Sequence, residues 1–162
     1  MNKSITLSSL FLLFFTISSS QSYTSLKEAL QNPNKVETLI LRDKGYKILP
    51  KAIFKLKNLK VLEIRNSEIT HIPKDFKKLK KLRKLSFINC PIATISPNLS
   101  KLKQLEELSF SKPTFVTIPD CIFDLTNLKK LSISYGKFQT ISKKIENLKN
   151  KRLGDIKPPK II

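Results

Sequence analysis

The feature of this sequence that most constrains its fold is a repeat of 23 residues, which begins at Val36 and returns at Leu59, Leu82, Leu105 and Leu128. Seven positions of the repeat are apolar in all five copies: the first, fourth, sixth, eleventh, fourteenth, eighteenth and twenty-first. All 35 of these sites are apolar, although only 40% of the chain is hydrophobic. Such a fixed period indicates a stack of structurally equivalent units.

The apolar positions also predict how the chain runs within each repeat. The fourth and sixth positions are two residues apart, so they share one face of a short strand, while the third, fifth and seventh positions share the other face. The fifteenth position holds Pro50, Pro73, Ser96, Pro119 and Ser142. Both residue types favour the start of a helical turn. We therefore expect one strand and one short helical segment per repeat, stacked around a continuous apolar core.

This pattern resembles the leucine-rich repeat family in its 23-residue form, L-x-x-L-x-L…I-P-x-x-I/F-x-x-L. The resemblance covers residues 36–150. It implies an α/β fold, a right-handed solenoid of about five repeats with a parallel sheet on the concave side and short helical segments on the convex side. The family usually places Asn or Cys at the ninth position, and this chain departs from it with Lys44, Ser67, Cys90, Pro113 and Gly136. Asn66 and Asn89 lie one residue earlier, and their role stays open at this point.

The segments outside the repeats predict export and two end caps. Residues 1–22 combine a positive start, a 13-residue apolar stretch and small residues, which is the pattern of a cleaved signal peptide. An uncleaved membrane anchor is the alternative. Residues 23–35 contain Ser25-x-x-Glu28, a capping box, and are expected to form a capping helix. Residues 151–162 are expected to form a partial repeat and a tail. We predict a secreted or periplasmic protein, without a transmembrane segment once the signal is removed.

The composition disfavours an enzyme. The chain has one His, two Cys and three Gly, and no glycine lies in a phosphate-binding motif. We therefore expect no catalytic residue, no metal and no cofactor, with His71 in a surface loop. Cys90 and Cys121 are expected to be two buried or half-buried thiols, and a disulfide between them is the alternative in an oxidising compartment.

The charge is strongly basic, with 31 Lys and Arg against 12 Asp and Glu. Many lysines fall at solvent positions of the predicted outer segments, and the densest run extends from Lys74 to Lys84. They form either a solvated face or a surface that attracts an anionic polysaccharide or a membrane. Specific nucleic-acid binding is disfavoured, because Phe76 and Phe87 occupy core positions and are not available for base stacking.

The other face of the predicted strands is the second candidate surface. It consists of the third, fifth and seventh strand positions together with one aromatic residue at the rim. The candidate ligand-binding residues are Ile40, Arg42, Val61, Glu63, Arg65, Lys84, Ser86, Ile88, Glu107, Ser109, Ser132 and Tyr135. The first three strands mix charged and apolar side chains as protein interfaces do, whereas the last two carry mostly serine. We predict a non-catalytic, monomeric scaffold that binds a protein ligand, with binding of anionic glycan or membrane by the outer lysines as the alternative.

Overall fold

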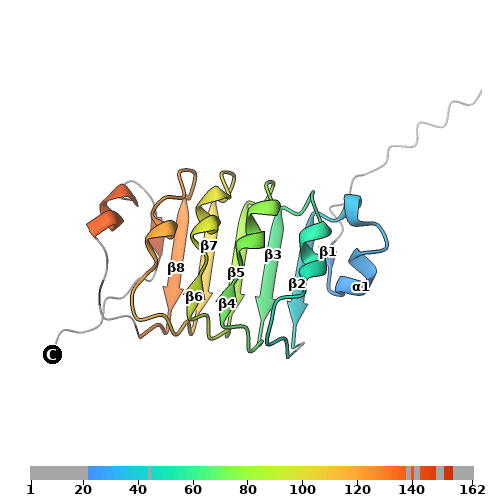
Figure 1. The fold of residues 1–162 in the computed structure, drawn as a ribbon, viewed down its shortest axis with the longest axis horizontal. Coiled ribbons are helices and arrows are strands. Elements are labelled where there is room, and N and C mark those ends of the chain that lie inside the picture. The colour runs from blue at the N-terminus through green and yellow to red at the C-terminus, as the bar shows by residue number, and fades with distance from the viewer. Residues whose placement is uncertain (1–21, 44, 138–139, 141–142, 149–151, 155–162) are drawn as a thin grey trace, which may run out of the picture.

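The repeats stack into one long sheet with a layer of short helices along one side (Figure 1). The computed structural model describes residues 22–43, 45–137, 140, 143–148 and 152–154. The sheet has seven strands, all parallel, in the order β1-β2-β3-β5-β7-β8-β9. These strands are β1 (Ser22–Tyr23), β2 (Thr38–Arg42), β3 (Val61–Arg65), β5 (Lys84–Ile88), β7 (Glu107–Ser111), β8 (Lys130–Ser134) and β9 (Arg152–Gly154).

A second, two-stranded sheet pairs β4 (His71–Ile72) with β6 (Thr94–Ile95). The described part has one α-helix, α1 (Leu26–Ala29), and its other helices are of the 3-10 type. The 3-10 helices are η1 (Pro33–Lys35), η2 (Lys51–Lys55), η3 (Lys74–Lys78), η4 (Pro97–Lys101), η5 (Asp120–Ile122) and η6 (Lys143–Leu148). The predicted α/β solenoid, with a parallel sheet and one short helical segment per repeat, is confirmed.

The length of the repeat sets the register of the sheet. From β2 to β8 each paired residue lies 23 positions from its partner, as Leu39 does from Leu62. The described residues of the seven apolar positions are buried, except Tyr46 and Ile145, which are partly buried against the same core. The predicted core is therefore confirmed over the described part of the chain. Three core predictions concern side chains outside it, those of Phe138, Ile141 and Leu148.

Aromatic side chains connect the core along the stack. The rings of Phe87 and Phe110 lie nearly parallel, with centroids 5.9 Å apart. Phe54 meets Phe76 edge-on at 5.5 Å, and Phe115 meets Phe110 edge-on at 5.7 Å. A tilted contact of 6.3 Å between Phe76 and Phe87 completes the series. Each such pair adds about 0.5–1.5 kcal/mol beyond the burial of its area, so the series ties four successive repeats together.

The outer segments form 3-10 helices because each is too short to propagate an α-helix. Pro50, Pro73 and Pro119 occupy the N-cap positions of η2, η3 and η5, where a missing backbone N–H costs little. The segments η2, η3 and η4 each have five residues, and each is followed by a buried leucine. In η3 this is Leu79, whose backbone N–H donates to the carbonyl of Phe76 at 2.9 Å. The residues between cap and leucine therefore point their polar side chains outward.

The chain ends differ in part from the sequence expectation. Within residues 23–35 the α-helix covers only four residues, and Ser25 Oγ accepts a hydrogen bond from the backbone N–H of Glu28 at 3.4 Å at its start. The residues just before it form β1, which extends the sheet by pairing with β2. At the other end β9 pairs with β8 at a spacing of 22 residues. Of the expected signal peptide, residues 1–22, all but Ser22 lie outside the described residues, and so do residues 155–162 of the tail.

The eighth position, directly after each main strand, turns the chain through a left-handed backbone conformation. Asp43, Asn66, Asn89, Lys112 and Tyr135 occupy it, with φ between 50° and 59°. Asn and Asp adopt this conformation more readily than most residues because their short side chains hydrogen-bond locally. Asn66 Nδ2 donates to Asp43 Oδ1 at 2.6 Å, and Asn89 Nδ2 donates to Asn66 Oδ1 at 2.9 Å. The side-chain ladder at the strand ends is thus built at the eighth position.

At the ninth position Ser67 and Cys90 are buried and donate to strand carbonyls. Ser67 Oγ donates to the carbonyl of Arg65 at 3.4 Å, and Cys90 Sγ lies 3.4 Å from the carbonyl of Ile88. Both cysteines are free and buried, as expected from the sequence. Burial raises the pKa of Cys90 and raises the pKa of Cys121 to about 11.

Candidate functional site

The sheet face opposite the helices, here called the concave face, carries the site predicted from the sequence. Because the strands are in register, its side chains form rows that run across the strands. The row of third positions contains Thr38, Val61, Lys84, Glu107 and Lys130. The row of fifth positions contains Ile40, Glu63, Ser86, Ser109 and Ser132. The row of seventh positions contains Arg42, Arg65, Ile88, Ser111 and Ser134.

The structure brings most of the predicted residues of β2, β3 and β5 together around Arg65, which lies between Arg42 and Ile88 in its row. Arg65 Nε donates to Glu63 Oε1 at 2.5 Å. This hydrogen bond and the charge of Glu63 raise the pKa of Arg65. On the next strand Lys84 Nζ lies 3.1 Å from Glu107. Charges on this part of the concave face are therefore largely paired.

Other predicted residues are placed differently from what the strand pattern suggested. Ser86 is only 3% exposed, because its short side chain lies in a row beside Glu63 and Ser109 and on a strand between the longer Lys84 and Ile88. Ser86 therefore exposes little surface in this structure, and its part in ligand binding stays a prediction. The apolar residues of the face, Ile40, Val61 and Ile88, each lie in a different row.

The last two strands of the face are the least distinctive part of the predicted site. Ser109 and Ser132 are partly buried neighbours in one row. Tyr135 is 81% exposed just after the end of β8, and two strands, β5 and β7, separate β8 from the strand of Arg65. At about 4.8 Å per strand, Tyr135 is on the order of 14 Å from that centre. It does not belong to the Arg65 cluster.

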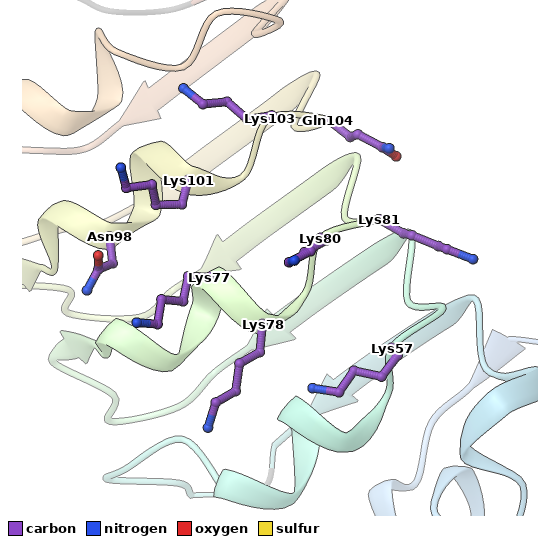
Figure 2. Close-up of a pocket in the computed structure, with 9 residues that line it drawn as sticks. All are labelled: Lys57, Lys77, Lys78, Lys80, Lys81, Asn98, Lys101, Lys103 and Gln104. Atoms are coloured by element: carbon purple, nitrogen blue, oxygen red, sulfur yellow. The ribbon is translucent and has the colours of Figure 1, made fainter.

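The helix side of the molecule holds a hollow of about 960 Å³, shown in Figure 2. Its lining comes from three neighbouring repeats, and we call it the lysine hollow. The residues that line it are Lys57, Lys77, Lys78, Lys80, Lys81, Asn98, Lys101, Lys103 and Gln104. The sequence predicted lysines on this side but not a hollow. The signal that could have found it is the return of lysine at Lys57, Lys80 and Lys103, one repeat apart.

Few carboxylates neutralise the lysine hollow. Among the described ion pairs, the one that involves a lining lysine joins Lys78 Nζ to Asp75 Oδ1 at 2.7 Å. Its hydrogen bond lowers the pKa of Asp75, and nearby lysines lower it further. Lys57 Nζ instead donates to the carbonyl of Phe54 at 2.7 Å, and Lys81 Nζ donates to a side-chain amide at 2.8 Å. The hollow therefore carries an excess of positive charge.

Other chemistry-bearing side chains have structural neighbours. Within the described residues no group of three or more His, Cys, Asp or Glu side chains could hold a metal ion, and no helix there has the length and apolar character to cross a membrane. His71 is exposed, and its Nδ1 lies 2.7 Å from the hydroxyl of Thr94. Glu106 Oε2 lies 2.9 Å from Lys129 Nζ, whereas the adjacent Glu107 contacts Lys84, so the two carboxylates do not act together.

A parallel sheet of 23-residue units, with short helices along one side and two distinct exposed faces, defines a solenoid repeat protein. A family profile described as a leucine-rich repeat region matches residues 21–157. The chain belongs to the leucine-rich repeat family, and the resemblance seen in the sequence is confirmed.

Solved structures of similar fold cover most of the chain. A leucine-rich-repeat protein of Leptospira interrogans is 35% identical, with a TM-score of 0.75 over 82% of this chain and 34% of that one. Internalin C2 of Listeria monocytogenes is 23% identical, with a TM-score of 0.63 over 82% of this chain and 56% of that one. The plant peptide hormone receptor RGFR1, in complex with RGF2, is 19% identical, with a TM-score of 0.57 over 74% of this chain and 22% of that one. The chain thus spans about a third of the Leptospira protein. A search of curated proteins found no match.

Proposed function

We propose that the chain is a non-catalytic, exported scaffold that binds a protein ligand on the concave face of its sheet. Leucine-rich-repeat proteins are commonly protein-binding scaffolds and generally lack catalytic activity of their own. The observation that carries the proposal for this chain is the cluster around Arg65. It combines a charged group held by Glu63 with Ile88 in the next strand.

This cluster has the properties of an interface centre. Arginine and bulky apolar residues carry much of the binding energy of protein interfaces. Arg65 is already fixed by Glu63, whose side chain is only 15% exposed. Binding a partner there therefore costs less side-chain entropy than ordering a free arginine would. The strands beneath are held by the sheet on both sides, which keeps the cluster rigid.

The test is a comparison of the exported wild-type chain with the double variant Arg65→Ala, Ile88→Ala. Proteins captured by immobilised wild type are identified by mass spectrometry, and the affinity of each purified candidate is measured by calorimetry. We expect the double variant to lose about 2–4 kcal/mol of binding free energy. The matched control is Ser111→Ala, Ser134→Ala, two serines of the same row that are outside the predicted site, and it is expected to bind as wild type does. A partner that binds all three chains equally would contradict the proposal.

Export is part of the same proposal and rests on the sequence of residues 1–22. Cleavage before Gln21 would leave both residues of β1 in the mature chain, whereas cleavage before Tyr23 would remove Ser22 from that strand. N-terminal sequencing of the protein recovered outside the cell distinguishes these sites. A recovered chain that still begins at Met1 would argue for the membrane-anchor alternative.

The lysine hollow supports a second candidate function, attraction to an anionic polysaccharide or membrane surface. Seven lysines line it, with Asp75 as the paired carboxylate among the described ion pairs. Salt separates the two candidates, because exposed charges are screened over about 10 Å at 0.1 M ionic strength. Binding by the hollow is expected to weaken steeply with added salt, whereas binding by the largely charge-paired concave cluster is expected to weaken modestly.

A further inference from the structure

We infer that the lysine hollow is a binding site for a linear acidic polysaccharide, which lies across the outer segments of the first three repeats. The inference rests on the second candidate function and deepens it in two ways. It chooses a polymer over a bilayer, and it places the end of the bound segment at the fourth repeat.

The lysines of the hollow repeat with the stacking of the chain. Lys57, Lys80 and Lys103 occupy the twenty-second position of three successive repeats, and Lys78 and Lys101 occupy the twentieth position of two (Figure 2). Adjacent strands of the sheet are spaced by about 4.8 Å, so ammonium groups recur on a similar scale along the solenoid. A polymer with an acidic group on each unit can contact several of them at once. The linked contacts strengthen one another because only the first is intermolecular.

The charge reverses where the hollow ends. In the fourth repeat Asp124 occupies the twentieth position, where the two preceding repeats have Lys78 and Lys101. The same outer segment begins with Asp120, whose carboxylate lies 3.1 Å from Lys144 Nζ. An anionic chain that leaves the hollow toward the fourth repeat would therefore meet carboxylates in place of lysines. This limits the favourable footprint to the first three repeats.

The residue types in the hollow select the class of polymer. Its basic residues are all lysines, which offer rotatable point charges without the planar fork of arginine that fits phosphate in two contacts. None of the described lining residues is aromatic, so the hollow has no platform on which nucleobases could stack. Asn98 and Gln104 add amide donors and acceptors that suit sugar hydroxyls.

A bilayer fits the hollow less well than a polymer does. Peripheral insertion into a membrane uses exposed apolar side chains beside the basic ones. The exposed large apolar residues of the described part are Ile48, Val116 and Tyr135, and none of them lines the hollow. The observations therefore favour a polysaccharide that carries carboxylate or sulfate groups.

The experiment measures binding of the exported chain to four probes by calorimetry at low salt. The probes are a heparin-derived octasaccharide, an oligogalacturonate of equal length, a single-stranded oligonucleotide of equal charge, and vesicles of phosphatidylcholine and phosphatidylglycerol. The first two separate sulfate from carboxylate as the recognised group, and binding of either supports the inference. Equal or tighter binding of the oligonucleotide or of the vesicles would overturn it, and vesicle binding without saccharide binding would do so while leaving the second candidate function standing.

Two variants with the same change of net charge locate the site. The hollow variant replaces Lys77, Lys80, Lys101 and Lys103 by Gln, and the control replaces the exposed Lys27, Lys35, Lys112 and Lys137 by Gln. We expect saccharide affinity to fall by about 30-fold in the hollow variant and by less than about three-fold in the control, as several small contacts are lost together. Equal losses in both variants would overturn the inference. The variant Arg65→Ala, Ile88→Ala is expected to retain saccharide binding. Failure of the saccharide inference can therefore be distinguished from failure of the proposal that the concave face binds a protein.

Discussion

The third repeat (residues 82–104) and the fourth repeat (residues 105–127) have nearly the same interior and different exteriors. Their buried positions pair directly, as Leu85 does with Leu108 and Phe87 with Phe110. On the helix side the third repeat contributes lysines and amides to the hollow, whereas the outer segment of the fourth begins and continues with aspartates. On the concave face Ile88 of the third repeat is replaced by a serine in the fourth.

This difference shows that the buried residues determine how the repeats stack, and that the exposed residues can vary without affecting the stacking. In a solenoid each unit contacts only its neighbours, so a unit that keeps the apolar positions can change its surface without disturbing the stack. Both candidate surfaces are concentrated in the first three repeats. The fourth repeat has the same scaffold without either cluster, so it is an internal reference for both.

The largest expected effect tests whether the two interiors are equivalent. Phe87→Ala and Phe110→Ala each remove a fully buried ring from the stacked pair, and each is expected to cost about 3–5 kcal/mol of unfolding free energy. Urea unfolding followed by circular dichroism measures this cost. Ser109→Ala, next to Phe110 on β7 but on the concave face, is the control and should change stability little. A much smaller cost for Phe110→Ala would mean that the fourth repeat is not part of the same cooperative core.

The next effect is a pH dependence of the unfolding free energy, caused by the buried thiol of Cys121 in the fourth repeat. Burial raises the pKa of Cys121 from 9.0 to about 11, so the folded chain keeps its thiol proton where the unfolded chain has lost it. The stability from this group is complete below pH 9.0 and is lost as the pH rises toward about 11. The expected loss is on the order of 2 kcal/mol. Unfolding midpoints across this pH range should fall more for wild type than for Cys121→Ala. If the midpoints of the two proteins fall equally with pH, the loss of stability does not come from Cys121.

Much of the fold could be predicted from the sequence because its cause is local and repeated. Burial requires apolar residues at the same points of every turn, and the 35 matching sites establish a period of 23 residues. Alternation along each strand likewise placed Arg65, Glu63 and Ile88 on one face. The amide ladder had a signal too, since Asp43, Asn66 and Asn89 recur at 23-residue intervals. Asn66 and Asn89 were noted in the sequence, but their role stayed open because the family pattern places the ladder at the ninth position.

Other features depend on neighbours that no single strand reveals. Ser86 is buried because longer side chains flank it in three dimensions, and its own alternation pattern predicts the opposite. The lysine hollow arises where the turns of three repeats lie side by side. Its lysines could therefore be identified in the sequence, but the hollow that they line could not. The two residues of β1 are too few to carry a strand pattern, and they pair only because the exposed edge of β2 is next to them.

A smaller effect tests the charge difference between the repeats. Asp124→Lys continues the line of Lys78 and Lys101 into the fourth repeat, so it should tighten binding of the heparin-derived octasaccharide by about three- to five-fold at low salt. Glu68→Lys makes the same charge change on an exposed loop and serves as the control. Calorimetric titration compares the two. An equal gain in both variants would show that net charge, and not the line of lysines, determines the affinity.

The smallest effect concerns the eighth position, where the third repeat has Asn89 and the fourth has Lys112. Lys112 is held at φ 59°, a conformation that costs lysine roughly 1 kcal/mol and costs asparagine less. Lys112→Asn also places an amide one repeat beyond Asn89, where it can continue the existing ladder. We therefore expect a gain of about 0.5–1 kcal/mol in unfolding free energy, measured by urea unfolding. Lys112→Ala is the discriminating control, because it removes the same charge without favouring a positive φ. Equal gains in the two variants would assign the effect to relieved charge repulsion, whereas a gain confined to Lys112→Asn would assign it to the backbone turn that the third repeat already satisfies.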